Sequence, residues 1–274
     1  IPRAAGLNQS MHGIMMIASA PLGALALSLM PIGYALFIDI ATALLGIVPL
    51  LVFKIPQDRT ATHASGNLLG ELKEGVDVIW QSKGFRLLYI LMAVVVMCVI
   101  PSFTLVPLLV KEHFGGGIKE VAVMEGLAGV GVVIGGALAA IIGAKRKMPW
   151  ILWGFSASSF FLGFVGFASS NMLWLATAFW FLSGLIFVLG NAPMTALIQT
   201  AIPNHIQGRA LSLLSTIIAL AAPVGLALAT PLGELIGIRW LFVVMGLTSG
   251  FIALIGFASR SLTQLENRAS LTSP

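Results

Sequence analysis

Charged residues are scarce in this sequence. Asp, Glu, Lys and Arg together make up 9% of the 274 residues, whereas hydrophobic residues make up 58%. A soluble domain carries about 25% charged residues. Such a chain has too little polar surface to cover a globule in water, so an ordinary soluble protein is excluded. The composition predicts a polytopic helical membrane protein.

Residues that bind metals or form disulfides are also few. The single cysteine, Cys98, excludes an internal disulfide and a thiolate metal cluster. The four histidines are scattered, with no pair at ligand spacing. We therefore expect no metal site and no cofactor. A membrane-embedded enzyme, such as a lipid-modifying transferase, would need paired carboxylates, a His-Asp cluster or a metal set. The sequence shows none of these, so we expect no enzymatic activity.

Long apolar runs are abundant. A helix needs about 20 apolar residues to cross a bilayer. Eight runs meet this length, at roughly 10–30, 33–53, 87–110, 120–143, 149–169, 172–202, 209–236 and 239–259. The runs are continuous rather than alternating, which favours helices over a β-barrel.

Basic residues gather in alternate loops between these runs. Twelve of the fifteen fall in one set of loops: Arg3, Lys54, Arg59, Lys73, Lys83, Arg86, Lys145, Arg146, Lys147, Arg209, Arg260 and Arg268. The opposite set holds Lys111, Lys119 and Arg239. This bias predicts that both termini are cytoplasmic. The net charge of +5 then reflects topology, so we expect no nucleic-acid partner.

One long polar segment, 55–86, separates the runs. Its apolar residues recur at helical spacing between Leu68 and Trp80, which predicts an amphipathic helix on the cytoplasmic membrane face. Such a helix is either a hinge between two bundles or a linker that hides its apolar side. The segment divides the chain into residues 1–54, with two spans, the linker 55–86, and residues 87–274, with six spans.

Residues 1–53 also resemble residues 202–256. Ile1-Pro2 matches Ile202-Pro203, and Ala20-Pro21-Leu22-Gly23 matches Ala222-Pro223-Val224-Gly225. Six spans separate the two copies, and parallel six-helix repeats are a signature of secondary transporters. By this count we expect a complete second half but only the last two helices of the first.

Three stretches resemble the major facilitator superfamily: GLNQSMHGIMMIASAPLGAL, FIDIATALLGIVPLLVFKIPQ and NAPMTALIQTAIPNHIQGRALSLLSTIIALAAPVGLALATPLGELIGIRWLF. The likeness is to its drug-efflux branch, which includes macrolide exporters and siderophore or transmembrane secretion effector proteins. The resemblance implies helices five to twelve of a twelve-helix fold, with about four helices missing before Ile1. It also implies a monomer in the cell (inner) membrane that needs no cofactor.

Two family motifs can be compared with this sequence. The antiporter motif, roughly G-P-x-x-G-G, corresponds to Ala20-Pro21-Leu22-Gly23-Ala24, where Pro21 and Gly23 are kept and two glycines are alanine. The cytoplasmic-loop motif, G-x-L-A-D-R-x-G-R-K, corresponds to Gly136, Leu138, Ala139, Gly143 and Lys145. Ala140 replaces the motif's Asp, so this half lacks the charge latch that the resemblance would imply.

Two carboxylates, Asp39 and Glu125, lie within predicted spans, about 9 Å from an outer turn at helical rise. Ionisable residues inside a membrane are costly, so each is a candidate for proton coupling. Alternatively, Glu125 is a carboxylate at the rim of the membrane that extends outward toward water or pairs with a lysine. Asp39 otherwise hydrogen-bonds to a neighbouring helix.

A polar stripe follows the span 172–202. Asn191, Thr195 and Gln199 fall four residues apart, and Phe187 continues the same face. These side chains either line a cavity or form ordinary interhelical hydrogen bonds. Phe103 is a further candidate for the apolar wall of a substrate pocket.

These features predict an exporter of small amphipathic compounds, macrolide-like or siderophore-like by resemblance, driven by protons through alternating access. The competing hypothesis is a fragment or remnant of such a transporter that does not transport.

Overall fold

The computed structural model describes residues 32–52, 80, 82–143, 146–202, 204–263 and 265. They are almost entirely helical. The helices are α2 (Ile32–Val52), α4 (Lys83–Glu112), α5 (Ile118–Ile142), α6 (Lys147–Phe167), α7 (Leu173–Ala201), α8 (Asn204–Ile236), α9 (Ile238–Ala258) and α10 (Arg260–Thr263). Among the described residues, six helices, α4 to α9, are long and apolar enough to cross a membrane. The structure thus confirms the predicted all-helical membrane protein.

The predicted spans match the helices in number and order wherever both can be compared. The second predicted span is α2, and the last six are α4 to α9. Two helices begin about one turn earlier than their apolar runs: α4 at Lys83 instead of 87, and α8 at Asn204 instead of 209. Polar residues there continue the helix past the hydrocarbon boundary, and hydropathy does not detect them. The first predicted span and the amphipathic segment lie largely outside the described residues.

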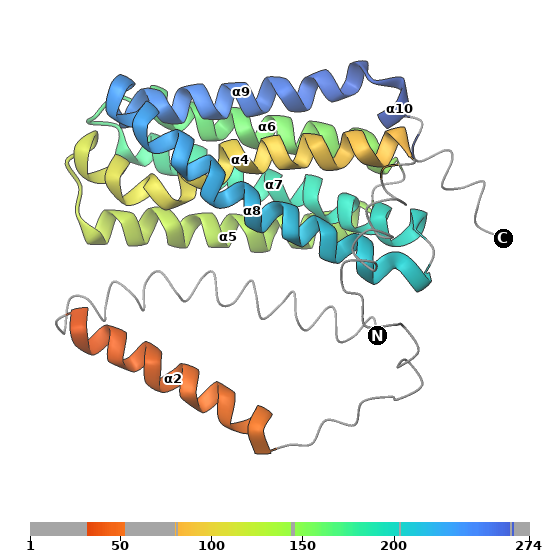
Figure 1. Cartoon of the computed structure of the whole chain (residues 1–274). Coiled ribbons are helices and arrows are strands. Elements are labelled where there is room, and N and C mark those ends of the chain that lie inside the picture. The colour runs from red at the N-terminus through yellow and green to blue at the C-terminus, as the bar shows by residue number, and fades with distance from the viewer. Residues whose placement is uncertain are drawn as a thin grey trace.

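Helices α4 to α9 form one bundle whose packing order differs from their order in the sequence (Figure 1). The main contacts are between α5 and α7, α7 and α6, α6 and α9, α9 and α4, and α4 and α8. Exchanging α4, α5 and α6 with α7, α8 and α9 reproduces this set of contacts. Because successive helices alternate in direction, the two three-helix units have opposite orientations. The bundle is therefore an inverted repeat.

Two ends of the bundle are distinguished below by their lysines. The Lys111 end carries the turns at 113–117 and 168–172 and at Gly237, and the Lys147 end carries those near 143–146, 202–203 and 259. Gly237 is the single residue between α8 and α9 and has a φ of 83°, which side chains disfavour. Its N–H donates to the Gly233 carbonyl at 2.8 Å, so the chain reverses in a very tight turn.

Glycines bring the helix backbones of the bundle into close contact. A Cβ at Gly154 of α6 would lie 2.6 Å from Gly190 Cα of α7, and a Cβ at Gly246 of α9 would meet the backbone of Gly163 in α6. On α8, a Cβ at Gly225 would meet the Met97 carbonyl of α4. Lipid is as apolar as leucine, so membrane helices associate by such close packing rather than by hydrophobic burial.

Serines on α6 add hydrogen bonds to both of its neighbours. Ser158 and Ser183 of α7 each donate to the other's carbonyl oxygen at 2.9 Å. On the α9 side, the Ser159 and Ser249 hydroxyls are 2.9 Å apart, and Ser156 donates to the Gly250 carbonyl. All five of these serines are buried. We call them the serine ladder; it ties α6 to α7 and α9.

Removing one rung of the serine ladder should destabilise the bundle. Ser158→Ala and Ser183→Ala should each cost about 0.6–2 kcal/mol, the range of interhelical hydrogen bonds in membranes. A double-mutant cycle, measured by unfolding in mixed micelles, should show coupling because the two residues bond to each other. Ser215→Ala is the matched control, since exposed Ser215 bonds to the Leu211 carbonyl of its own helix. A cycle without coupling would contradict the reciprocal bonds.

Candidate functional site

Glu125 lies well inside a membrane-spanning helix. It is the eighth residue of α5 and is half-buried, next to the fully buried Met124. The other carboxylates of α4 to α9, which are Glu112, Glu120 and Glu234, all lie within one turn of a helix end. Asp39 lies in α2, but its side chain is outside the description. Among the carboxylates of α4 to α9, Glu125 is thus the one farthest from a helix end.

The polar stripe of α7 changes environment along its length. Phe187 packs edge-on against Phe155 of α6, with ring centroids 5.5 Å apart. Asn191 and Thr195 are half-buried, and Thr195 donates to the Asn191 carbonyl of its own helix at 3.1 Å. Gln199 is exposed near the Lys147 end. The stripe therefore runs from the bundle core toward that end, and a role in binding substrate stays a prediction.

Glu125 and the polar stripe are not brought together. Helices α5 and α7 run in the same direction, both starting at the Lys111 end. Glu125 is in the first third of α5, whereas the polar members of the stripe, Asn191 to Gln199, lie in the second half of α7. A proton at Glu125 and a substrate at the stripe would have to influence each other through helix movement rather than by direct contact.

Phe103 belongs to an aromatic cluster between α4, α7 and α9. Its ring centroid is 4.9 Å from that of Trp180, which in turn is 6.4 Å from Phe242. Trp180 and Phe242 are fully buried, whereas Phe103 is 39% exposed. Phe103 thus forms the accessible edge of the cluster, and its role in the wall of a substrate pocket stays a prediction.

The family-motif residues are described only in part. Ala20, Pro21, Gly23, Ala24 and Lys145 lie outside the described residues. Gly136 lies within α5. Gly143 ends that helix in the left-handed conformation, with a φ of 50°, and its N–H donates to the Ala139 carbonyl. Glycine at this position allows the left-handed backbone conformation with which the chain leaves α5.

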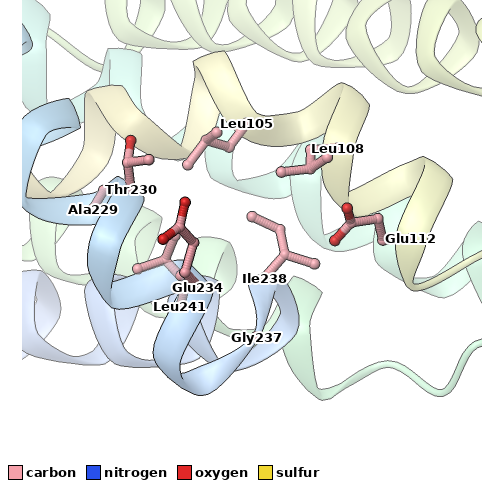
Figure 2. Close-up of a pocket in the computed structure, with 10 residues that line it drawn as sticks. Leu105, Leu108, Glu112, Ala229, Thr230, Glu234, Gly237, Ile238 and Leu241 are labelled. Carbon is pink, nitrogen blue, oxygen red and sulfur yellow. The ribbon is translucent and has the colours of Figure 1, made fainter.

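A pocket of about 470 Å³ opens at the Lys111 end between α4, α8 and the start of α9 (Figure 2). Its walls are mainly apolar, formed by Leu105, Leu108, Ile238 and Leu241. Glu112 from α4 and Glu234 from α8 add two carboxylates, and none of the described residues lining the pocket is basic. In Figure 2 the Glu234 carboxylate lies below Leu105, and the Glu112 carboxylate lies on the other side of Ile238. The pocket therefore combines an apolar interior with negative charge.

Arg239 follows the pocket residue Ile238 but has other partners. The sequence suggests a surface pair between Arg239 and Glu234. In the structure, Arg239 Nε donates to the Gly166 carbonyl at 2.8 Å, and the guanidinium lies 5.3 Å from the Trp240 ring centroid. His113 Nε2 likewise donates to the Ala168 carbonyl at 2.9 Å. These two side chains satisfy carbonyls at the C-terminal end of α6, which have no partner within the helix.

Sequence reasoning missed this pocket because it depends on which helices are neighbours. Glu112 and Glu234 are more than a hundred residues apart, and each alone looks like an ordinary charge beside a turn. The contact between α4 and α8 joins them. The one available signal was that both carboxylates flank turns on the same predicted side of the membrane.

Known proteins resemble this chain over most of its length. Macrolide efflux protein A of Streptococcus pyogenes is 28% identical over 262 residues, which cover 93% of this chain and 64% of that protein. Macrolide efflux protein A of Enterococcus faecalis is 28% identical over 233 residues, covering 82% and 71%. The chain thus spans less than two thirds of the length of the Streptococcus pyogenes relative. No solved structure matches the chain.

The family profile described as Major Facilitator Superfamily matches residues 1–225 and 121–273, which together cover nearly the whole sequence. The bundle agrees with this match, because each half of such transporters contains two three-helix units in inverted orientation. With the apolar helices α4 to α9 and the two efflux relatives, these findings establish that the chain belongs to the Major Facilitator Superfamily of membrane transporters.

Proposed function

We propose that this protein exports small amphipathic compounds across the cell membrane by proton-coupled alternating access. The observation that carries the proposal is the similarity to two macrolide efflux proteins along most of the chain. A macrolide-like drug is therefore the first substrate to test, and a siderophore is the second.

The arrangement of the bundle supports alternating access. Helices α5 and α8 are the least buried of the six, so much of their surface is free to contact a second six-helix unit. Parallel units of this kind, related by an axis along the membrane normal, rock against each other in secondary transporters. Prolines 101, 107, 193, 223 and 231 interrupt the hydrogen bonding of α4, α7 and α8. These three helices can therefore bend during such a movement.

The charge distribution supports a cytoplasmic Lys147 end. Lys83, Arg86, Arg146, Lys147 and Arg260 lie at this end, and the opposite end carries Lys111, Lys119 and Arg239. Positive residues favour the cytoplasmic side. The Lys111 end, with its pocket, would then face outward.

Glu125 is the proposed proton-coupling group. It is the carboxylate of α4 to α9 that is farthest inside a span. Placing an ionisable group inside a membrane costs free energy, so such a group is a candidate for function. Asn191, Thr195 and Gln199 are the proposed polar contacts for substrate, with Phe187 and Phe103 on the apolar side. Asp39 is a second candidate for proton coupling.

Drug susceptibility in an efflux-deficient bacterial strain tests the proposal. Expression should raise the inhibitory concentration of a macrolide several-fold, and collapsing the proton gradient should abolish the accompanying drug efflux. In everted vesicles, adding the drug should release protons from an acidified interior. No change in resistance or accumulation, with the protein present in the membrane, would count against export. Efflux that persists after the proton gradient is collapsed would count against proton coupling but not against export.

A further inference from the structure

We infer that the pocket between α4, α8 and α9 binds amphipathic cations, with Glu112 and Glu234 recognising a positively charged amine and the apolar walls holding its hydrophobic body. The inference rests on the proposed function only in identifying this cation as a transported substrate. Binding itself requires no transport.

The size and lining of the pocket suit such a ligand. A volume of about 470 Å³ is within the range of small-molecule sites, roughly 300–1,000 Å³. Leucines and Ile238 form an apolar surface from two sides, and the two carboxylates lie on different helices at different places along it (Figure 2). A ligand with one charged group and an apolar body could satisfy both kinds of wall at once.

The negative charge of the pocket is not neutralised from within it. The described lining residues include no lysine or arginine. Arg239, the nearest basic residue along α9, is held by the Gly166 carbonyl and Trp240. Lys111 is adjacent to Glu112 in sequence, and adjacent residues on a helix point in different directions. A cation entering the pocket would therefore meet two acidic groups.

Equilibrium binding to the purified protein in phosphatidylglycerol nanodiscs tests the inference. The probes are an alkyl trimethylammonium compound and its neutral analogue, in which a tert-butyl group replaces the ammonium. The Glu112→Gln/Glu234→Gln double variant should bind the cation at least about fivefold more weakly and the neutral analogue equally well. Higher salt should weaken binding of the cation to the unmodified protein, because these carboxylates are exposed to solvent.

Glu120→Gln is the matched control at the same end of the bundle. Glu120 accepts a hydrogen bond from the Gly117 N–H at 2.7 Å and lies outside the pocket, so this variant should bind the cation normally. Equal affinity of the double variant and the unmodified protein for the cation would overturn the inference. So would equal affinity of the unmodified protein for the cation and the neutral analogue.

Two further measurements complete the test. The first distinguishes a lipid ligand from a transported substrate, and the second tests the cation site apart from the proposed function. If phosphatidylcholine in the nanodisc, whose headgroup carries the same trimethylammonium group as the probe, displaces the probe, the pocket binds a lipid headgroup and the assignment to a substrate is wrong. Binding needs no proton gradient, so Glu125→Gln should leave it intact. Normal cation binding in a protein that confers no efflux would reject the proposed function and retain the cation site.

Discussion

Replacing Gly246 with leucine is expected to prevent the six-helix bundle from folding. A Cβ at this position of α9 would meet the backbone N and Cα of Gly163 and lie 2.7 Å from the Ser159 carbonyl of α6. Backbone atoms cannot move aside as a flexible side chain can, so the two helices would have to separate. Separation would also break the bond between Ser159 and Ser249. Overpacking a core typically costs about 1–3 kcal/mol, and this substitution should exceed that range.

A graded series makes this prediction quantitative. Gly246→Ala adds only the Cβ and should destabilise the protein by about 1–3 kcal/mol. Gly126→Ala in α5 is its control, because a Cβ there meets nothing within 4 Å. Alanine favours a helix over glycine, so the control should be neutral or slightly stabilising. Thermal unfolding in detergent gives the comparison, and equal melting temperatures for both alanine variants would contradict the close contact between α6 and α9.

Replacing Glu125 with glutamine is expected to uncouple export from the proton gradient. Glutamine keeps the size of the side chain and its hydrogen-bonding oxygen but cannot bind and release a proton. Proton-driven efflux should fall by at least about tenfold, the effect of about 1.4 kcal/mol on a rate. Drug-induced proton movement in everted vesicles should fall to the level of vesicles without the protein.

Two controls show whether an effect of Glu125→Gln is specific to that carboxylate and independent of protein stability. Glu120→Gln changes a carboxylate in the same helix, and the glutamine oxygen can still accept the Gly117 N–H, so transport should persist. Thermal stability of Glu125→Gln should equal that of the unmodified protein. Unchanged proton movement in Glu125→Gln would reject its role and leave Asp39 as the next carboxylate to test.

Hydrophobic runs were sufficient to predict where the helices lie. Twenty apolar residues in succession have few alternatives in a membrane, since only helices and closed barrels satisfy the backbone there and barrel strands alternate apolar with polar residues. The helix starts at Lys83 and Asn204 were missed because polar residues outside the hydrocarbon can still be helical. Glu125 is a candidate for a related reason: a charge stands out against an apolar run, although its role stays a prediction.

The neighbours of each helix could not be predicted in the same way. Apolar residues face lipid and protein alike, as the 80% exposed Ile141 and the fully buried Ile151 show. Residues that do mark contacts, such as Gly154, Gly190 and Ser158, are small and common, and the sequence does not pair them. The pocket at Glu112 and Glu234 was missed for this reason, whereas the α7 stripe, which lies on one helix, needed no pairing to be recognised.

The packing order of the bundle has a consequence for how the protein is made. A ribosome delivers α4 to the membrane before α5, α6 and α7, yet the main partners of α4 are α8 and α9. Gly84, at the start of α4, also lies against Leu265, which is synthesised last of all the described residues. Contacts between residues so distant in sequence form slowly. Helix α4 must therefore wait in the membrane, with its contact surface for α8 and α9 uncovered, until translation of the described chain is nearly complete.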